Sequence, residues 1–307
     1  MNGWHVSLLL LMWPAIAVGT SLPSITTPGS GGVTGAVLGL APGTRAQALG
    51  GAFAGLASDS SAVWWNPGGL GQITQFDLEV LGYSIESPNG VGMATVAVPV
   101  GPGVAGLGYT FIGLGSYEVR DEEGLKSGVE GLTEMAIFAG WGMKNPGWLP
   151  LKGTWGVTVG LGGDAVGQWT PTVGLGEVAT LGDTVSAGCV VRNLGVPADG
   201  ALTPLAVAVG VGWRPRGWVT TSAEIRYGIG DGLFDAGVGA EWNLLRSLSL
   251  RAGYKLGPSN GGVKSLSGPT FGFGARAGRI GVNYAYDPIG SLGAMSRLSL
   301  TWGAFRR

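Results

Sequence analysis

The sequence predicts an all-β protein: a transmembrane antiparallel β-barrel of about 14 strands with a small N-terminal plug, or hatch, inside it. Three observations predict this class. The chain is 45% hydrophobic and only 12% charged, whereas about a quarter of the residues are charged in ordinary soluble domains. Its 61 glycines and 17 prolines disfavour long helices, because each glycine costs about 1 kcal/mol and each proline about 3 kcal/mol in a helix interior. Finally, apolar and polar residues alternate along much of the chain, as in strands with lipid on one side and water on the other.

The first 20 residues are expected to be a signal peptide. Residues 6–18 form an apolar run that is shorter than the roughly 20 residues of a membrane-spanning helix. Small residues at Ala15, Ala17 and Gly19 offer a cleavage site, and a buried N-terminal strand or helix is the alternative. The predicted organisation is therefore a signal peptide at 1–20, a plug or hatch at 21–74 and a transmembrane barrel at 75–307.

The segment 43–70 cannot be a membrane strand, because it lacks the two-residue alternation and is rich in alanine and glycine. Thr44 is a candidate N-cap for a short helix that runs to about Ala57, and Asp59 or Ser60 could cap a second turn. The segment closes with an Asn-Pro-Gly turn signal. Its composition alone fits a compact plug or a periplasmic subdomain.

Strict alternation begins near residue 75. In 218–227, for example, Val219 and Tyr227 fall on one face of a strand and Glu224 and Arg226 on the other. Segments of this kind have the length that a tilted strand needs to cross an outer membrane. The predicted strands are 75–84, 91–99, 103–112, 131–142, 153–162, 170–178, 183–193, 202–213, 217–227, 232–243, 246–256, 269–277, 279–287 and 294–305.

Loop lengths support this strand count. Outer-membrane barrels alternate short periplasmic turns with longer extracellular loops. The connections after even-numbered strands are tight, as at 100–102 and 179–182, and those after odd-numbered strands are longer, as at 113–130 and 257–268. The segment 143–152 is longer than expected for the short side.

Six tryptophans are predicted to form a girdle at the short-turn rim. All fall at strand ends and on the apolar face, as expected at a membrane interface. They are Trp141, Trp155, Trp213, Trp218, Trp242 and Trp302.

A water-soluble antiparallel sandwich would also alternate, but its outward face would be charged. Here the polar side of several strands is glycine instead. Because glycine in a strand marks close approach by another backbone, we interpret these positions as room for the plug. They are Gly106, Gly108, Gly156, Gly160, Gly162, Gly210, Gly212, Gly272 and Gly274.

The rest of the inward face carries charges on neighbouring strands, which could pair as cross-strand ions. We expect this lumen charge network to be structural more than a substrate site. Its predicted members are Glu224, Arg226, Asp235, Glu241, Arg251 and Lys255.

The segment 43–70 resembles the box at the start of PorV/PorQ proteins, which are relatives of the FadL fatty-acid channels with their Asn-Pro-Ala plug motif. Further matches occur at 191–195, 250–254 and 282–300, so the resemblance covers most of the mature chain. Two departures are that Gly68 replaces the alanine of the family and that two arginines follow Phe305. The hatch residues that match the box or flank its motif are Arg45, Gly50, Gly51, Asp59, Trp64, Trp65, Asn66, Pro67 and Gly68.

The resemblance implies an outer-membrane barrel with an internal hatch. The protein would arrive in the outer membrane after signal-peptide export and would contact the lipid there. It leaves two functions open. FadL relatives pass hydrophobic molecules such as long-chain fatty acids and release them laterally when the hatch shifts. PorV relatives act in type IX secretion, in which case the loop 113–130, with Tyr117, Arg120 and Asp121 to Glu123, would bind a secreted or surface protein.

An enzyme, a metal site and a cofactor are not expected. His5, in the predicted signal peptide, is the only histidine, so the mature chain lacks the imidazole of a Ser-His-Asp or Cys-His site. Cys189 is the only cysteine and is predicted to face lipid as a packing residue. The formal net charge is −1 and the sequence has no basic cluster. It therefore lacks the electrostatic footprint that a nucleic-acid-binding protein needs.

Overall fold

The computed structural model describes residues 36–84, 90–120, 124–146, 152–165, 167–195, 203–229, 232–257, 267–288 and 294–303. The predicted signal peptide and the first part of the predicted plug segment lie outside these residues. None of the helices in the described ranges has the length and apolarity to cross a membrane.

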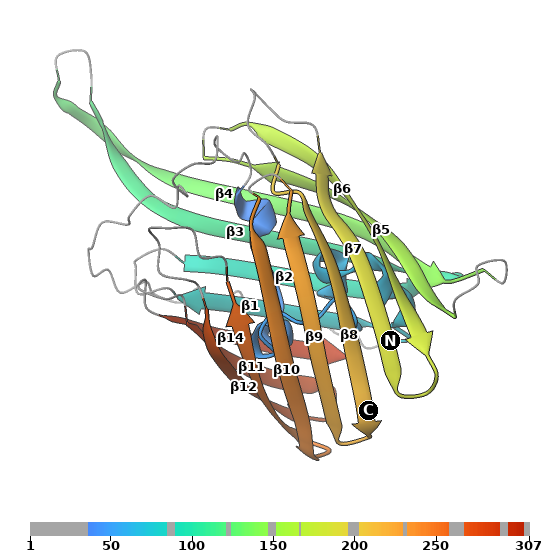
Figure 1. Cartoon of the computed structure of the whole chain (residues 1–307). Coiled ribbons are helices and arrows are strands. Elements are labelled where there is room, and N and C mark those ends of the chain that lie inside the picture. The colour runs from blue at the N-terminus through green and yellow to red at the C-terminus, as the bar shows by residue number, and fades with distance from the viewer. Residues whose placement is uncertain are drawn as a thin grey trace, which may run out of the picture.

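A closed antiparallel barrel dominates the fold (Figure 1). Each strand pairs with its neighbours in sequence, and β1 closes the circle by pairing with β14, from Asp77 opposite Gly303 to Ser84 opposite Ser296. Within the described residues the 14 strands are β1 Asp77–Ser84, β2 Gly90–Val100, β3 Gly103–Arg120, β4 Lys126–Lys144, β5 Gly153–Gly163, β6 Trp169–Leu181, β7 Val185–Gly195, β8 Ala206–Arg216, β9 Val219–Gly228, β10 Phe234–Leu245, β11 Leu248–Leu256, β12 Gly268–Ala277, β13 Ile280–Pro288 and β14 Ala294–Gly303.

The predicted fold class is confirmed, and every predicted strand range overlaps one of these strands. One expectation is wrong: 113–130 is not simply a loop, because β3 continues to Arg120 and β4 already begins at Lys126. Glycines and charges on both sides of the turn conceal the alternation there. Both strands run past the rest of the barrel as a long hairpin (Figure 1).

The outward face of the barrel is an apolar band between two rims of aromatic side chains. Five of the six predicted tryptophans, all but the partly buried Trp141, are exposed at the short-turn rim, and Tyr227, Phe234, Tyr254 and Tyr286 are exposed toward the other. Trp242 and Phe234 lie eight residues apart in β10, about 27 Å along a strand and about 21 Å along the axis at a tilt of about 40°. This is close to the height of about 25 Å that a membrane barrel presents to lipid.

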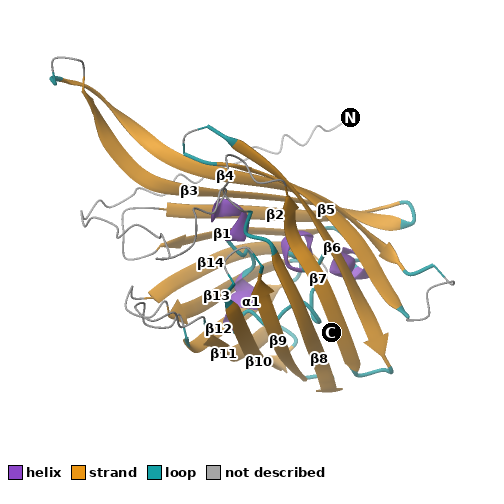
Figure 2. Cartoon of the chain, turned by 45° about the horizontal axis from the view of Figure 1, so that its top comes forward, coloured by secondary structure: helices purple, strands orange, loops and turns teal. Residues whose placement is uncertain are grey.

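The hatch lies inside this wall and consists of four short helices, η1 Ala36–Gly39, α1 Thr44–Ala48, α2 Ala62–Trp65 and η2 Pro67–Gln72 (Figure 2). The helix predicted from Thr44 to about Ala57 is shorter in the structure and ends at Ala48. The chain turns just after it at Gly50 and Gly51, whose φ angles are 69° and 76°.

The caps of these helices also differ from the prediction. Gly43, not Thr44, is the N-cap of α1, and it makes no side-chain cap. Before α2, Asp59 does accept hydrogen bonds from the Ser61 amide (3.2 Å) and the Ser61 hydroxyl (2.5 Å), so the second predicted turn is stabilised by one of its two candidate residues.

Candidate functional site: the hatch in the barrel lumen

The hatch runs through the lumen from the long-loop rim to the short-turn rim. Near its start, Leu38 packs against Gly162, beside the end of β5 that leads into a long-side connection. Near its end, Gly71 lies against the backbone of Met143, close to the turn that joins β4 and β5. The described part of the hatch therefore extends between the two mouths of the barrel.

Wall glycines let the hatch approach the strands closely. A Cβ added at Gly156 would meet the Pro67 carbonyl group, and one added at Gly210 would come within 3.1 Å of the Gly55 nitrogen. Seven of the nine glycines predicted for this role meet the hatch in this way: Gly106, Gly108, Gly156, Gly162, Gly210, Gly212 and Gly272.

The interpretation is wrong for Gly160 and Gly274, because their nearest neighbours are wall side chains. Phe138 and Thr172 fill the space at Gly160, and Asn283 and Arg251 fill the space at Gly274. Alternation in the sequence identifies a glycine that faces inward, but it does not show which neighbouring residue fills the space beside it. The hatch also lies close to wall glycines that were not predicted for this role: Gly140, Gly142, Gly176, Gly188, Gly237, Gly239 and Gly253.

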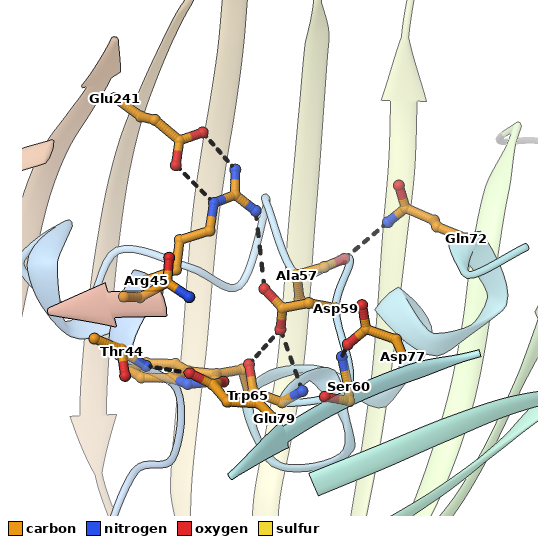
Figure 3. A network of polar contacts seen from close by, with 12 residues as sticks. Thr44, Arg45, Ala57, Asp59, Ser60, Trp65, Gln72, Asp77, Glu79 and Glu241 are labelled. Atoms are coloured by element: carbon orange, nitrogen blue, oxygen red, sulfur yellow. Dashed lines mark hydrogen bonds and ion pairs between the residues drawn. The ribbon is translucent and has the colours of Figure 1, made fainter. Parts of the chain in front are cut away.

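Wall carboxylates accept hydrogen bonds from backbone amides of the hatch (Figure 3). Glu79 of β1 accepts from the Thr44 amide at 3.1 Å, which satisfies a free N–H at the start of α1. Asp77 accepts from the Ser60 amide at 2.9 Å. Glu224 of β9 accepts from two successive amides, those of residues 53 and 54, at 2.8 and 2.7 Å. The hatch backbone is thus shaped by side chains far away in the sequence.

Arg45 connects the hatch to the opposite wall (Figure 3). Its guanidinium donates to both oxygens of Glu241 in β10, at 2.8 and 2.9 Å, and lies 3.9 Å from Asp59 of the hatch. Burial lowers the pKa of Arg45, but the Glu241 and Asp59 carboxylates raise it more, so the net pKa lies above its ordinary range. Arg45 therefore stays charged, and we call this contact the Arg45 latch.

Trp64 and Trp65 pack edge to face with ring centroids 5.0 Å apart and are buried in the lumen. Their indole N–H groups donate to the carbonyl groups of Leu38 and Pro42, at 2.9 and 2.7 Å, which ties α2 to the start of the hatch. Arg192 of β7 lies over both rings, 4.7 and 5.3 Å from the centroids, and donates to the Trp65 carbonyl at 3.0 Å.

Asn66 links the hatch to itself and to the wall. Its side-chain amide donates to the carbonyl groups of Ala54 and Glu177, at 2.9 and 3.0 Å, and its oxygen accepts from the Gly68 amide at 3.1 Å. Pro67 then starts η2, where a missing N–H costs nothing. The turn signal predicted from sequence is thus a three-way junction between two parts of the hatch and β6.

All six members of the predicted lumen charge network form ion pairs. Arg226 lies 2.9 Å from Glu224 and 3.3 Å from Asp235. Arg251 lies 2.7 Å from the same Glu241 that holds Arg45. Lys255 pairs with Asp287 and also donates to Gln47 of the hatch at 2.7 Å.

Four further buried charged residues belong to the same lumen lining but were not predicted as members of the charge network: Glu79, Arg192, Asp287 and Arg297. Arg192, for example, lies 3.3 Å from Glu224. Each of the four falls at the inward position of its strand, so the alternation that found the other six could have found them.

The lumen lining is amphipathic. Strands β9 to β14 carry most of the charges, with Glu79 of β1 and Arg192 of β7 as exceptions. Strands β1 to β4 present buried apolar side chains that pack in one cluster with Val37 and Leu38 of the hatch. These side chains are Leu81, Tyr83, Val91, Met93, Ile112 and Phe138.

A small cavity lies between the hatch and strands β4 to β7. Val63, Trp64 and Pro67 line it on the hatch side, and Gly174 and Arg192 are among its wall residues. Its volume is about 10 Å³, about the room that one water molecule needs. At this place the β6–β7 register shifts between Val173 and Leu175, and Asn193 has a φ of 56°, so the cavity meets a β-bulge in the wall.

The described ranges hold no group of three or more His, Cys, Asp or Glu residues that could bind a metal ion. Cys189 is exposed on the outer face of β7, as predicted.

Solved structures share this architecture. The toluene transporter TodX of Pseudomonas putida has a TM-score of 0.59 at 12% identity over 85% of this chain and 97% of its own. The toluene transporter TbuX of Ralstonia pickettii has a TM-score of 0.51 at 12% identity over 85% and 97%. A FadL homologue of Pseudomonas aeruginosa has a TM-score of 0.51 at 11% identity over 84% and 97%.

The chain has the fold of these barrels. At such low identity the likeness concerns architecture alone. No protein-family model matches the sequence, and neither does a curated protein. The specific resemblance of 43–70 to PorV/PorQ proteins, with its implied role in secretion, stays a prediction.

Proposed function

We propose that the protein is an outer-membrane channel for the passive transport of hydrophobic molecules, closed at rest by its hatch and opened when the middle of the hatch shifts. One observation supports this most directly: a segment of the chain fills the bore of a closed barrel, yet side-chain contacts and not strand pairing hold it there. Contacts of this kind can be exchanged without breaking the barrel.

The amphipathic lining favours a hydrophobic solute. The interior of a water-filled porin is polar, whereas β1 to β4 offer an apolar cluster beside the hatch, toward the long-loop mouth. A hydrophobic molecule that enters at this mouth would meet this cluster first.

The bulge in the wall supports release into the membrane. The cavity beside Trp64 reaches the place where the β6–β7 ladder is interrupted. Enlarging the cavity by moving α2 would open a path toward lipid at this interruption of the wall, because the unpaired residue of a bulge leaves the ladder without a regular bond.

The test is to lock the hatch by disulfides. An ideal Cβ at Gly106 lies 3.3 Å from the Val63 Cβ, and one at Gly210 lies 3.3 Å from the Ala54 Cβ, both close to the spacing of about 3.5–4.5 Å in disulfides. The two double variants, Val63→Cys with Gly106→Cys and Ala54→Cys with Gly210→Cys, are made in a Cys189→Ser background. Uptake of the hydrophobic dye phenylnaphthylamine is measured in Gram-negative cells that produce each variant.

Oxidation should abolish dye uptake through the locked proteins, and a reductant should restore it. The four single-cysteine proteins are the controls and should not respond to oxidation. Uptake that is the same in oxidised and reduced locked proteins, or no greater than in cells without the protein, would show that the hatch does not gate a hydrophobic path.

A further inference from the structure

The hairpin of β3 and β4 extends well beyond its neighbours (Figures 1 and 2). These strands have 18 and 19 residues. Pairing with β2 ends at Ile112, and pairing with β5 ends at Met135. Among the residues that the structure describes, 113–120 and 126–134 therefore pair only with each other, and we call this part the ribbon.

The ribbon stands in water. Tyr109 and Phe111 lie just before the ribbon in β3 and are exposed on the outer face. They are at the level of the aromatic rim on the long-loop side of the barrel. Beyond them most exposed side chains are polar, as at Ser116 and Glu118, and Leu125 at the turn is the exception. Lipid therefore covers β3 up to about Phe111 and does not cover the ribbon.

A two-stranded ribbon in water is marginally stable, because three or more strands are needed for an independent sheet. This one is weakened further by glycines, including Gly115, Gly128 and Gly131. Its ion pair between Glu118 and Lys126, at 2.9 Å, is about half exposed on both sides and contributes about 0–1 kcal/mol. A third strand would supply the stabilisation that the ribbon lacks.

The two edges of the ribbon differ. On the β3 side an extra residue, Leu114, interrupts the register between Gly113 and Gly115, and such bulges protect an edge from further pairing. On the β4 side the register is regular from Gly128 onward. The stretch Gly128–Glu134 contains no proline, lysine or arginine, which are the residues that usually block an exposed edge.

We propose that the free β4 edge at Gly128–Glu134 binds a basic, extended segment of another protein, which adds to the ribbon as a third strand. The sign of the partner follows from charge: the edge segment Gly128–Glu134 contains two acidic residues and no basic one. Glu134, at the foot of this edge, accepts a hydrogen bond from the backbone of Val37 in the hatch, so peptide binding and dye uptake are measured separately.

Peptide binding tests the proposal directly. The probe is a labelled peptide of four Thr-Lys repeats, which is basic and favours strands but is too polar to enter lipid. It is added to the protein in lipid nanodiscs, and binding is followed by fluorescence anisotropy together with hydrogen exchange of the ribbon amides. The expected result is saturable binding and slower exchange in 128–134, with 113–120 less affected.

Two matched peptides separate strand addition from simple charge attraction. A Thr-Lys peptide that is N-methylated at alternate amides cannot pair along one edge, so its affinity should fall about tenfold or more through lost hydrogen bonds. A Thr-Glu peptide should not bind. Equal binding of the N-methylated peptide, or binding without protection in 128–134, would contradict the proposal.

A truncated protein is the second arm. Ile112 and Glu134 lie opposite each other, so replacing 113–133 by an Asn-Gly turn removes the ribbon edge and leaves the barrel pairing intact. This variant should lose peptide binding and keep dye uptake. Unchanged peptide binding by the truncated protein, or no binding by the complete protein, would overturn the proposal whatever the channel does.

Discussion

At the level of single residues, Gly68 shows how tightly the hatch fits the wall. An ideal Cβ there would lie 2.8 Å from the Glu177 Cα and the Gly176 oxygen, and 2.9 Å from the Thr154 oxygen. All three are backbone atoms and cannot rotate away. The wall therefore lies closer to this position than an alanine would permit.

Gly68→Ala should therefore destabilise the seated hatch by about 1–3 kcal/mol, the usual cost of overpacking. The measurement is the urea midpoint of unfolding in lipid vesicles. Gly217→Ala is the matched control, because a Cβ there meets nothing within 4 Å. Equal midpoints for the two variants would mean that the hatch tolerates the extra methyl group.

The sequence reveals most lumen residues, because a two-residue period assigns each side chain to lipid or to the interior. In the structure the six predicted charges take part in ion pairs, and seven of the nine predicted glycines lie against the hatch. The partners were not predictable. Asn66, for example, donates to a carbonyl group 111 residues away, and no local pattern records such a contact.

At the level of elements, α1 is held by the Arg45 latch. Glu241 is 6% exposed and Arg45 is 24% exposed, so this bidentate pair is much less screened than a surface pair. Arg251 also depends on Glu241, at 2.7 Å. Removing the carboxylate charge would leave two guanidinium groups without their main partner.

Glu241→Gln should destabilise the closed hatch by about 3 kcal/mol, as expected when one member of a buried pair is removed. Hydrogen exchange of residues 44–51 should become faster, and dye uptake should rise. Glu118→Gln, which breaks the exposed pair with Lys126, should change neither quantity measurably. The latch is unimportant for gating if both variants behave alike.

The elements of the hatch were harder to predict than the strands. The end of α1 depends on Gly50 and Gly51, which the sequence shows, but its start depends on Glu79, a wall residue 35 positions later. The extension of β3 and β4 was missed for a different reason. The strands of the ribbon are rich in glycine and face water on both sides, so no apolar face identifies them in the sequence.

At the level of the whole molecule, the outer surface is arranged for lipid. Cys189 tests this arrangement without new cysteines, since it is exposed on the outer face of β7 and lies opposite Val209. It is four residues from the rim position Val185, which pairs with Trp213, so it falls inside the apolar band.

In lipid vesicles, Cys189 should react with a lipophilic pyrene maleimide and not with a charged, water-soluble maleimide. Lipids that carry a quencher in their acyl chains should then quench the pyrene. A cysteine at Ser127, introduced in a Cys189→Ser background, is the control and should react with the charged reagent. Rapid labelling of Cys189 by the charged reagent would contradict a lipid-facing β7.

The pairing of β1 with β14 has a consequence for biogenesis. The hatch leads directly into β1, and β1 closes the ring by pairing with β14. Inserting the hatch into a completed ring would pass Arg45, Trp64 and Trp65 through a lumen in which wall and hatch backbones lie close together. We therefore expect the seam between β1 and β14 to close around a hatch that is already in place.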